Sequence, residues 1–415
     1  MWNFSKHFRE IFFRPNDRYA VIDGLRALAM LWVLNFHSMF GVTKILDRGE
    51  LTEFMQSFPL AFNILWQGDK AVDVFFIVSG FLIGLFLYRD MKFEGGIRFK
   101  RFYSRRLLRI VPVYLFVLGL YFAVGYRTDF PQLITNLLFV SNLLPSHYEV
   151  VHVSWTLMIE MQFYFLAPFF VVAFMKSGRP VLVMAFMFLI AFYFRYQALI
   201  LRPDGWEPEF YEIVFGDVEG RSLWLAIYEN IYTRYAPLVL GLFISYHYVF
   251  NRDAVVSWFN NNQKLRYLIM LAGLSLVAYT TIDGLHNPLS SYYESFQPLD
   301  NLYYYTFNRN FFSLGCAILI FDMMFMPIKH NILSRFLAMR IWYPISQVVF
   351  PFYLIHSFLV VVAGIIVFGT TNLDHIHMVS LFEVFGITII ATILTFILAI
   401  PIHVFIERPF MEARN

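Results

Sequence analysis

The chain contains little charge and almost no cysteine. Charged residues make up 15% of its 415 residues, against about 25% in a typical soluble domain. This shortage of charge excludes a soluble globular protein of this length. The single cysteine, Cys316, lies within an apolar run, and it therefore excludes intrachain disulfides and metal sites built from several cysteines.

Several binding and catalytic motifs are also absent from the sequence. It has no GxxxxGKS or GxxxxGKT phosphate loop and no HExxH, GxSxG or CxxC motif, which argues against the nucleotide-hydrolysing, zinc-protease, serine-hydrolase and dithiol classes. No internal repeat suggests the inverted halves of a secondary transporter. The N-terminal segment lacks a short apolar core with a small-residue cleavage site, so we do not expect a signal peptide.

Hydrophobic residues, in contrast, make up 59% of the chain, and 50 of them are Phe. A membrane-spanning helix needs about 20 predominantly apolar residues. We therefore expect an all-α polytopic membrane protein with ten spans, near residues 24–43, 67–88, 110–126, 153–175, 180–200, 232–250, 267–283, 306–327, 343–369 and 379–405. The intervening segment 127–152 is interpreted as a loop or as a re-entrant or interfacial piece.

The charges of the connecting segments predict how these spans are oriented. Cations gather at both termini and in alternate connections: Arg9, Arg14, Arg18, residues 89–109, Lys176, Arg179, Arg252, Lys264, Arg266, Lys329, Arg335, Arg340, Arg408 and Arg414. The connection 201–231, on the other side, is acidic. Because cytoplasmic loops carry the excess of Lys and Arg, both termini are predicted to be cytoplasmic. The expected organisation is a cytoplasmic amphipathic segment 1–23, one transmembrane domain 24–405 and a short cytoplasmic tail 406–415.

The most informative segment is the junction between the apolar stretch 73–88 and the basic loop 89–109. This loop holds eight Arg or Lys against two acids. Within it, Arg105 and Arg109 are about one helical turn apart, and Arg106 is adjacent to their face. Planar guanidinium groups suit phosphate, so these three arginines are predicted to hold the phosphates of coenzyme A. Anionic lipid headgroups are the competing ligand.

Ionisable residues inside predicted spans are costly and therefore mark candidate functional sites. Arg26 and His37 lie eleven residues apart in the first span, about three helical turns, so they face the same side of the helix. We predict that His37 is a catalytic base; a histidine satisfied by a neighbouring helix is the alternative. Glu160 in the fourth span is the predicted carboxylate partner of His37, and a structural pair with Arg26 is the alternative.

Other polar residues in the spans are secondary candidates. Asp73 is an alternative to Glu160 as the carboxylate, and Ser79 either contacts substrate or allows close helix packing. The further candidates for substrate binding are Trp155, Gln162, Tyr164, Arg234 and His356. Arg234 is interpreted as an interfacial anchor or as a cation at the outer mouth of a cavity, and His356 also fits a satisfied structural histidine.

Six pieces of the sequence, in the right order, resemble the acyltransferase 3 family of membrane-bound O-acyltransferases. They are VIDGLRALAMLWVLNFH, DVFFIVSGFLIG, FYSRRLLRIVPVY, WTLMIEMQFYFLAP, FYLIHSF and IERPF. The resemblance implies a cytoplasmic acyl-CoA donor and an acceptor hydroxyl, usually on a carbohydrate.

The resemblance also implies roles for particular residues. His37 becomes the central catalytic residue, Arg26 its partner in the motif, and Arg105, Arg106 and Arg109 the donor-side cations. The chain departs from the family pattern at two positions: Thr156 stands where Ser is usual, and Met161 replaces a second Glu. Glu160 is therefore expected to act without a paired carboxylate.

We therefore expect an integral membrane acyltransferase that moves an acyl group from acyl-CoA to a hydroxyl of a carbohydrate. The expected acyl group is acetyl, and the expected acceptor is a surface polysaccharide or a glycolipid such as lipopolysaccharide. The resemblance implies a bacterial inner membrane. Some members of the family append an esterase-like domain, and we expect none in this chain. Membrane lipid, acyl-CoA and the carbohydrate are the expected partners, without metal or nucleic acid. The alternatives are a transporter or flippase of a glycan or anionic lipid intermediate, and a lipid-binding structural membrane protein. No oligomeric state is predicted.

Overall fold

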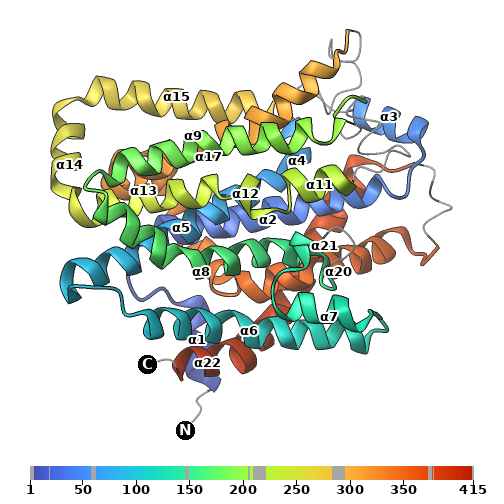
Figure 1. The fold of residues 1–415 in the computed structure, drawn as a ribbon. Helices are drawn as coiled ribbons and strands as arrows, with labels where there is room; N and C mark the ends of the chain where they lie inside the picture. The colour runs from blue at the N-terminus through green and yellow to red at the C-terminus, as the bar shows by residue number, and fades with distance from the viewer. Residues whose placement is uncertain are drawn as a thin grey trace.

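Long helices lying side by side make up the computed structural model of the chain (Figure 1). The structure describes residues 4–17, 19–57, 62–144, 149–203, 206–208, 221–282, 295–372, 376 and 378–413. Within these ranges every regular element is a helix, which confirms the all-α prediction. Arg18, Arg414 and most of the acidic part of the 201–231 connection lie outside the described residues.

Seven helices in the described part of the chain are long and apolar enough to cross a membrane. They are α2 (Ala20–Val42), α5 (Ala71–Glu94), α6 (Phe99–Ala123), α8 (Trp155–Lys176), α9 (Pro180–Ile200), α20 (Val349–Phe368) and α21 (Leu381–Ile402). The chain is therefore an integral multi-pass membrane protein. The other three expected spans coincide with α13 (Ala236–Phe250), α15 (Gln263–Thr281) and α17 (Pro298–Phe325), which are shorter or less apolar, so the count of ten stays a prediction.

The third span begins earlier than its apolar residues predicted. Helix α5 continues to Glu94 and ends at Gly95, which takes a left-handed conformation (φ 73°) that glycine adopts without strain. Helix α6 then starts at Phe99 instead of residue 110. The expected basic loop is thus mostly helical. Its later arginines lie on α6, and the rotation of that helix determines what each of them contacts.

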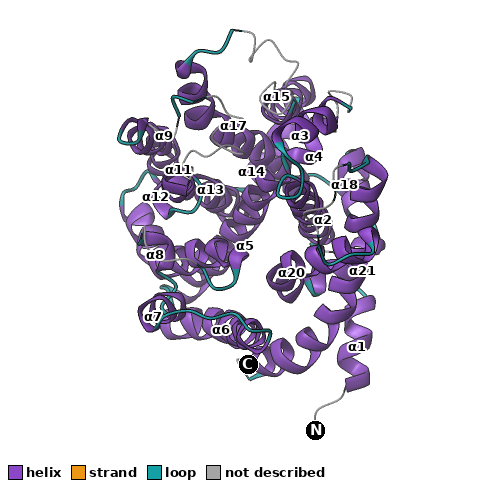
Figure 2. Cartoon of the chain, turned by 90° about the vertical axis from the view of Figure 1, so that its right-hand side faces the viewer, coloured by secondary structure: helices purple, strands orange, loops and turns teal. Residues whose placement is uncertain are grey.

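Helices α5 and α13 approach each other closely, near the middle of the molecule in Figure 2. A Cβ added to Gly80 would fall on the carbonyl oxygen of Leu238, and one added to Gly241 would fall on that of Ile77. Small residues let helix backbones approach closely in membranes. The close-packing interpretation of the Ser79–Gly80 pair is therefore correct for Gly80.

The segment 127–152 contains a short helix, α7 (Phe130–Leu137). The Asp129 side chain caps it by accepting a hydrogen bond from the backbone N–H of Gln132 at 2.7 Å. Eight residues are too few to cross a bilayer, and residues 145–148 lie outside the described part. The choice between a re-entrant piece and a surface loop stays open.

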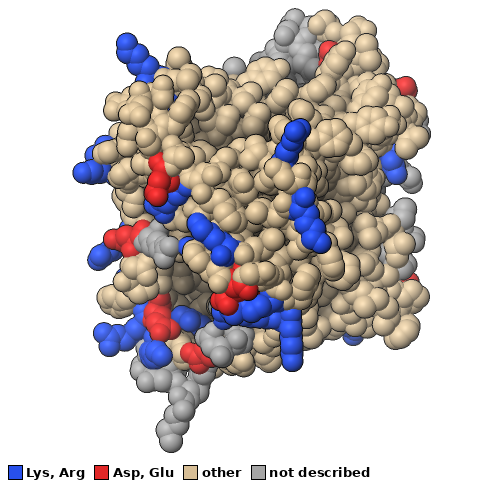
Figure 3. All heavy atoms as spheres, turned by 60° about the vertical axis from the view of Figure 1, so that its left-hand side comes forward, with Lys and Arg blue, Asp and Glu red and all other residues tan. Residues whose placement is uncertain are grey.

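Both ends of the chain lie close together, at the lower edge of the view in Figure 1. Helix α1 (Phe4–Phe12) meets α22 (Arg408–Glu412) there, and the Glu10 carboxylate pairs with the Arg408 guanidinium at 2.8 Å. Figure 3 shows Lys and Arg side chains gathered over part of the surface beside a broad uncharged area. This distribution is typical of a protein with one basic membrane-flanking side.

Candidate active site

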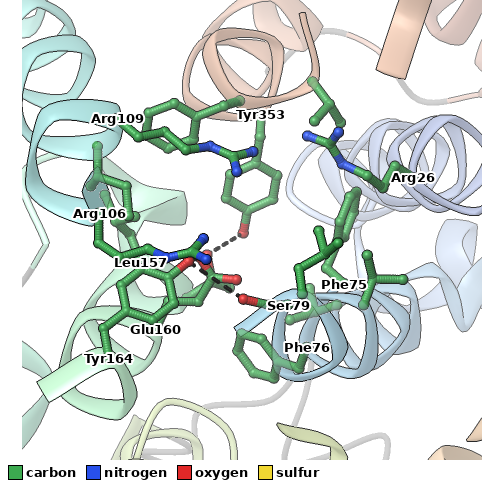
Figure 4. A pocket seen from close by; sticks show the side chains of 17 residues that line it. Arg26, Phe75, Phe76, Ser79, Arg106, Arg109, Leu157, Glu160, Tyr164 and Tyr353 are labelled. Atoms are coloured by element: carbon green, nitrogen blue, oxygen red, sulfur yellow. Dashed lines mark hydrogen bonds between the residues drawn. The ribbon is translucent and has the colours of Figure 1, made fainter. Parts of the chain in front are cut away.

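A cavity of about 110 Å³ lies inside the bundle, between α2, α5, α6, α8 and α20 (Figure 4). Apolar side chains of α5, α6, α8 and α20 form much of its wall. Its polar lining residues are Arg26, Ser79, Arg106, Arg109, Thr156, Glu160, Tyr164 and Tyr353. Six of these eight are site residues predicted from the sequence, and they come from segments far apart in the chain. We call this space the arginine-lined cavity.

Three arginines supply the positive charge of the cavity. Arg26 reaches it from α2, and Arg106 and Arg109 reach it from the facing helix α6 (Figure 4). Because Arg106 and Arg109 are three residues apart, they share one face of α6. Arg105 does not line the cavity; its guanidinium lies 5.7 Å from the ring centre of Phe86. The structure therefore groups Arg26 with Arg106 and Arg109 at the cavity and leaves Arg105 outside its lining.

A chain of hydroxyl groups leads from the carboxylate of Glu160 across the cavity. The Tyr164 hydroxyl donates to Glu160 Oε2 at 3.1 Å, and the Ser79 hydroxyl lies 3.4 Å from the Tyr164 oxygen. The Arg106 guanidinium lies over the Tyr164 ring, 5.4 Å from its centre. Glu160 thus balances part of the charge of the arginines.

His37 has a different partner from the one predicted. Its Nδ1 lies 2.9 Å from the carbonyl oxygen of Val33 and 3.1 Å from Nε2 of His356. The two imidazole rings are nearly perpendicular, with centres 4.8 Å apart. Glu160 instead bonds to Tyr164, so the expected Glu160–His37 pair is wrong. His37 and His356, the histidine pair, lie deeper along α2 and α20 than the arginine-lined cavity.

Tyr353 connects the cavity to the histidine pair. Its side chain lines the cavity, where its hydroxyl donates to the carbonyl of Val153 at 3.1 Å and lies 3.0 Å from the Thr156 hydroxyl. Its backbone carbonyl accepts a hydrogen bond from Nδ1 of His356 at 2.5 Å. One turn of α20 therefore joins the two parts of the site.

Asp73 belongs to a buried ion network and not to the histidine pair. Its carboxylate lies 2.7 Å from Arg309 Nη1 and 3.5 Å from Arg234 Nη2, and Arg309 also binds Asp69. A carboxylate held by two guanidinium groups is poorly suited to orient a histidine. Arg309 did not figure among the predicted site residues, although a cation inside the apolar run 306–327 is a signal that could have identified it.

The remaining predicted residues lie outside the cavity lining. Arg234, expected at an outer mouth, is 1% exposed, and its guanidinium lies 5.5 Å from the ring centre of Trp155. Trp155 also packs on Tyr228, with ring centres 4.6 Å apart. Gln162 donates to the carbonyl of Phe139 at 2.9 Å, which anchors the segment after α7. In the described residues no group of three or more His, Cys, Asp or Glu could hold a metal ion.

Comparison with known proteins defines the family of the chain. The acyltransferase 3 family model, described as an acyltransferase domain, matches residues 19–404. The chain therefore belongs to this acyltransferase family, as its motifs predicted. No solved structure matches the chain.

Curated relatives match parts of the chain. Peptidoglycan O-acetyltransferase OatA of Listeria monocytogenes is 29% identical over 37% of this chain and 24% of its own length. A putative O-acetyltransferase of Staphylococcus aureus is 27% identical over 40% of this chain and 27% of its own length. The regulator of hypoxia-inducible factor 1 of Caenorhabditis elegans is 25% identical over 60% of this chain and 55% of its own. The chain thus spans about a quarter of each of the two O-acetyltransferases.

Proposed function

We propose that this protein is a membrane O-acyltransferase that moves an acetyl group from cytoplasmic acetyl-CoA to a hydroxyl of a surface polysaccharide or glycolipid, in a bacterial inner membrane. The observation that carries the proposal is the arginine-lined cavity, with three guanidinium groups inside a bundle of apolar helices in a member of an acyltransferase family. Cations are costly in that position, and the phosphates of a polyanionic donor compensate their charge.

The donor enters, in this proposal, from the end of the bundle at which α2 and α6 begin. Coenzyme A carries a pyrophosphate and a 3′-phosphate, and guanidinium forks bind phosphate bidentately. Arg26 and His37 are eleven residues apart on α2, which corresponds to roughly 16 Å of helical rise. An extended pantetheine arm covers that distance, so phosphates held by Arg26, Arg106 and Arg109 leave the thioester close to the histidine pair.

The transfer itself needs a base, because a sugar hydroxyl is a weak nucleophile at neutral pH. His37 Nε2 takes the hydroxyl proton while the oxygen attacks the thioester carbonyl carbon. When the tetrahedral intermediate collapses, the carbon–sulfur bond breaks, and the CoA sulfur leaves with the proton from His37. The products are the acetyl ester and free CoA. A positioned base contributes about 10²–10⁴-fold to such a step.

Thiol release tests the proposal directly. Purified protein in detergent or liposomes is given acetyl-CoA with and without a candidate glycan acceptor, and free CoA is measured with a thiol reagent. We expect acceptor-dependent CoA release matched by one acetyl unit of added mass on the glycan. Glycan or lipid movement across a liposome membrane without CoA release would instead favour the transporter alternative.

A further inference from the structure

The hydrogen bonds of the histidine pair determine where its protons lie. The Val33 carbonyl faces Nδ1 of His37 at 2.9 Å, and the Tyr353 carbonyl faces Nδ1 of His356 at 2.5 Å. Carbonyl oxygens only accept hydrogen bonds, so each Nδ1 carries a proton. The contact of 3.1 Å between His356 Nε2 and His37 Nδ1 is then a hydrogen bond from His37 to a lone pair on His356.

The opposite arrangement fails on the same contacts. If His356 carried a proton on Nε2 and donated it, His37 Nδ1 would need a lone pair. That lone pair would face the Val33 carbonyl oxygen at 2.9 Å, which brings two acceptors together without a proton between them. Two neutral rings satisfy all three contacts only when both are protonated on Nδ1. The proton of His37 is shared between the Val33 carbonyl and His356.

From this geometry we infer that His356 is a positioning residue, which acts with the Val33 carbonyl to hold His37 in the tautomer whose Nε2 lone pair accepts the proton of the acceptor hydroxyl. A base that is protonated on the wrong nitrogen cannot act, and enzymes commonly set the tautomer through a second group on the other nitrogen. That group is often a carboxylate; here it is a neutral histidine. This inference rests on the proposed acyl transfer for its effect on rate, but not for the tautomer itself.

The location of His356 supports this role. Its side chain is fully buried, at 0% exposure, on α20, and its other nitrogen is occupied by Tyr353 of the same helix turn. It therefore has no lone pair or proton to spare for a substrate.

Three substitutions separate positioning from a general structural role. His356→Leu removes the acceptor of the His37 proton, whereas His356→Gln keeps an amide oxygen near the former Nε2 position. His247→Leu on α13 is the matched control, since His247 is a partly buried histidine bonded to Asn251 and outside the site. For His356→Leu we expect kcat to fall about 10- to 100-fold with KM for donor and acceptor within twofold. His356→Gln should recover most of kcat, and His247→Leu should leave it unchanged.

A double substitution tests whether His356 acts through His37. In a His37→Ala background, His356→Leu should cause no further loss of the residual rate, because the base that it orients is gone. An unchanged kcat for His356→Leu, an equal loss for His356→Gln, or a further loss in the His37→Ala background would each overturn the inference.

Nitrogen-15 NMR of histidine-labelled protein reads the tautomer without any activity. Nε2 of His37 should have the shift of an unprotonated nitrogen in wild type and in His356→Gln, and a mixture of tautomers in His356→Leu. A protonated Nε2 in wild type would overturn the inference even if transfer is observed. Absence of transfer with the expected spectrum would instead contradict the proposed function alone.

Discussion

At the scale of single residues, the site separates its charged groups from its base. The three arginines and Glu160 line the cavity, while His37 is bonded to a carbonyl and a second imidazole. In the proposed mechanism, the charges therefore bind the donor and a neutral hydrogen-bond network orients the base. Each group can be tested by a substitution that leaves the other in place.

His37→Ala should lower the rate of acetyl transfer by at least about 10²-fold, because it removes the general base. The substitution leaves the cavity arginines in place, so the dissociation constant of CoA should stay within about threefold of wild type. Single-turnover transfer and CoA binding, measured on monodisperse protein, check both values. Transfer within threefold of wild type would contradict the assignment of His37.

Glu160→Gln should reduce thermal stability and make the protein more responsive to CoA. The amide still accepts the Tyr164 hydrogen bond, but the negative charge beside Arg106 and Arg109 is lost. Phosphates of bound CoA restore that charge, so the increase in Tm on adding CoA should be larger than in wild type. Tyr164→Phe is the control, since it removes the bond and keeps the charge; its CoA response should match wild type. An equal CoA response in Glu160→Gln would show that the carboxylate does not balance the cavity arginines.

At the scale of helices, α6 presents chemically similar side chains to different surroundings. Arg106→Gln with Arg109→Gln should raise the dissociation constant of acetyl-CoA at least about tenfold, since a charge-assisted contact contributes roughly 1.5–3 kcal/mol. Arg105→Gln is the matched control: because Arg105 lies over Phe86 outside the cavity, its effect should stay within about twofold. Isothermal titration at two salt concentrations measures the dissociation constant of acetyl-CoA for wild type and both variants. Equal losses for both variants would mean that the whole basic segment acts as one diffuse charge.

The crossing of α5 and α13 should be sensitive to a single methyl group. Gly241→Ala places a Cβ against the backbone of α5, and such overpacking costs about 1–3 kcal/mol or more. Gly119→Ala on α6 meets no atom within 4 Å, so its effect should be neutral or slightly stabilising through helix propensity. Thermal unfolding in one detergent compares the two. A Tm for Gly241→Ala equal to that of Gly119→Ala would contradict the close backbone contact.

At the scale of the whole molecule, the proposed function requires the basic end of the bundle to face the cytoplasm. A cysteine placed at Gly95, between α5 and α6, should be labelled only from the cytoplasmic side. A cysteine at Thr371, after the other end of α20, should be labelled only from outside. Cys316, which is partly buried in α17, is replaced by Ala in both variants. Labelling of Gly95→Cys from outside would contradict the cytoplasmic donor.

The sequence contained enough information to predict the family and the helices. Long apolar runs determine where spans form because backbone polar groups must be satisfied inside a bilayer, and the 180–200 prediction coincides with α9. A helix boundary departs from the prediction where hydropathy and helix propensity disagree. Helix α6 starts at Phe99 because its arginines are good helix formers, although hydropathy alone places the start at residue 110.

Which polar groups meet was decided only by the tertiary structure. Periodicity places Arg26 and His37 on one face of α2, but it cannot show that Arg26 faces Arg109 or that His37 bonds to His356, 319 residues later. A single sequence specifies the face of each helix and not its rotation against its neighbours, which depends on the packing of the bundle as a whole. For that reason Arg105, Arg106 and Arg109 were predicted to act alike, whereas the packed bundle brings Arg106 and Arg109 into the cavity and leaves Arg105 outside.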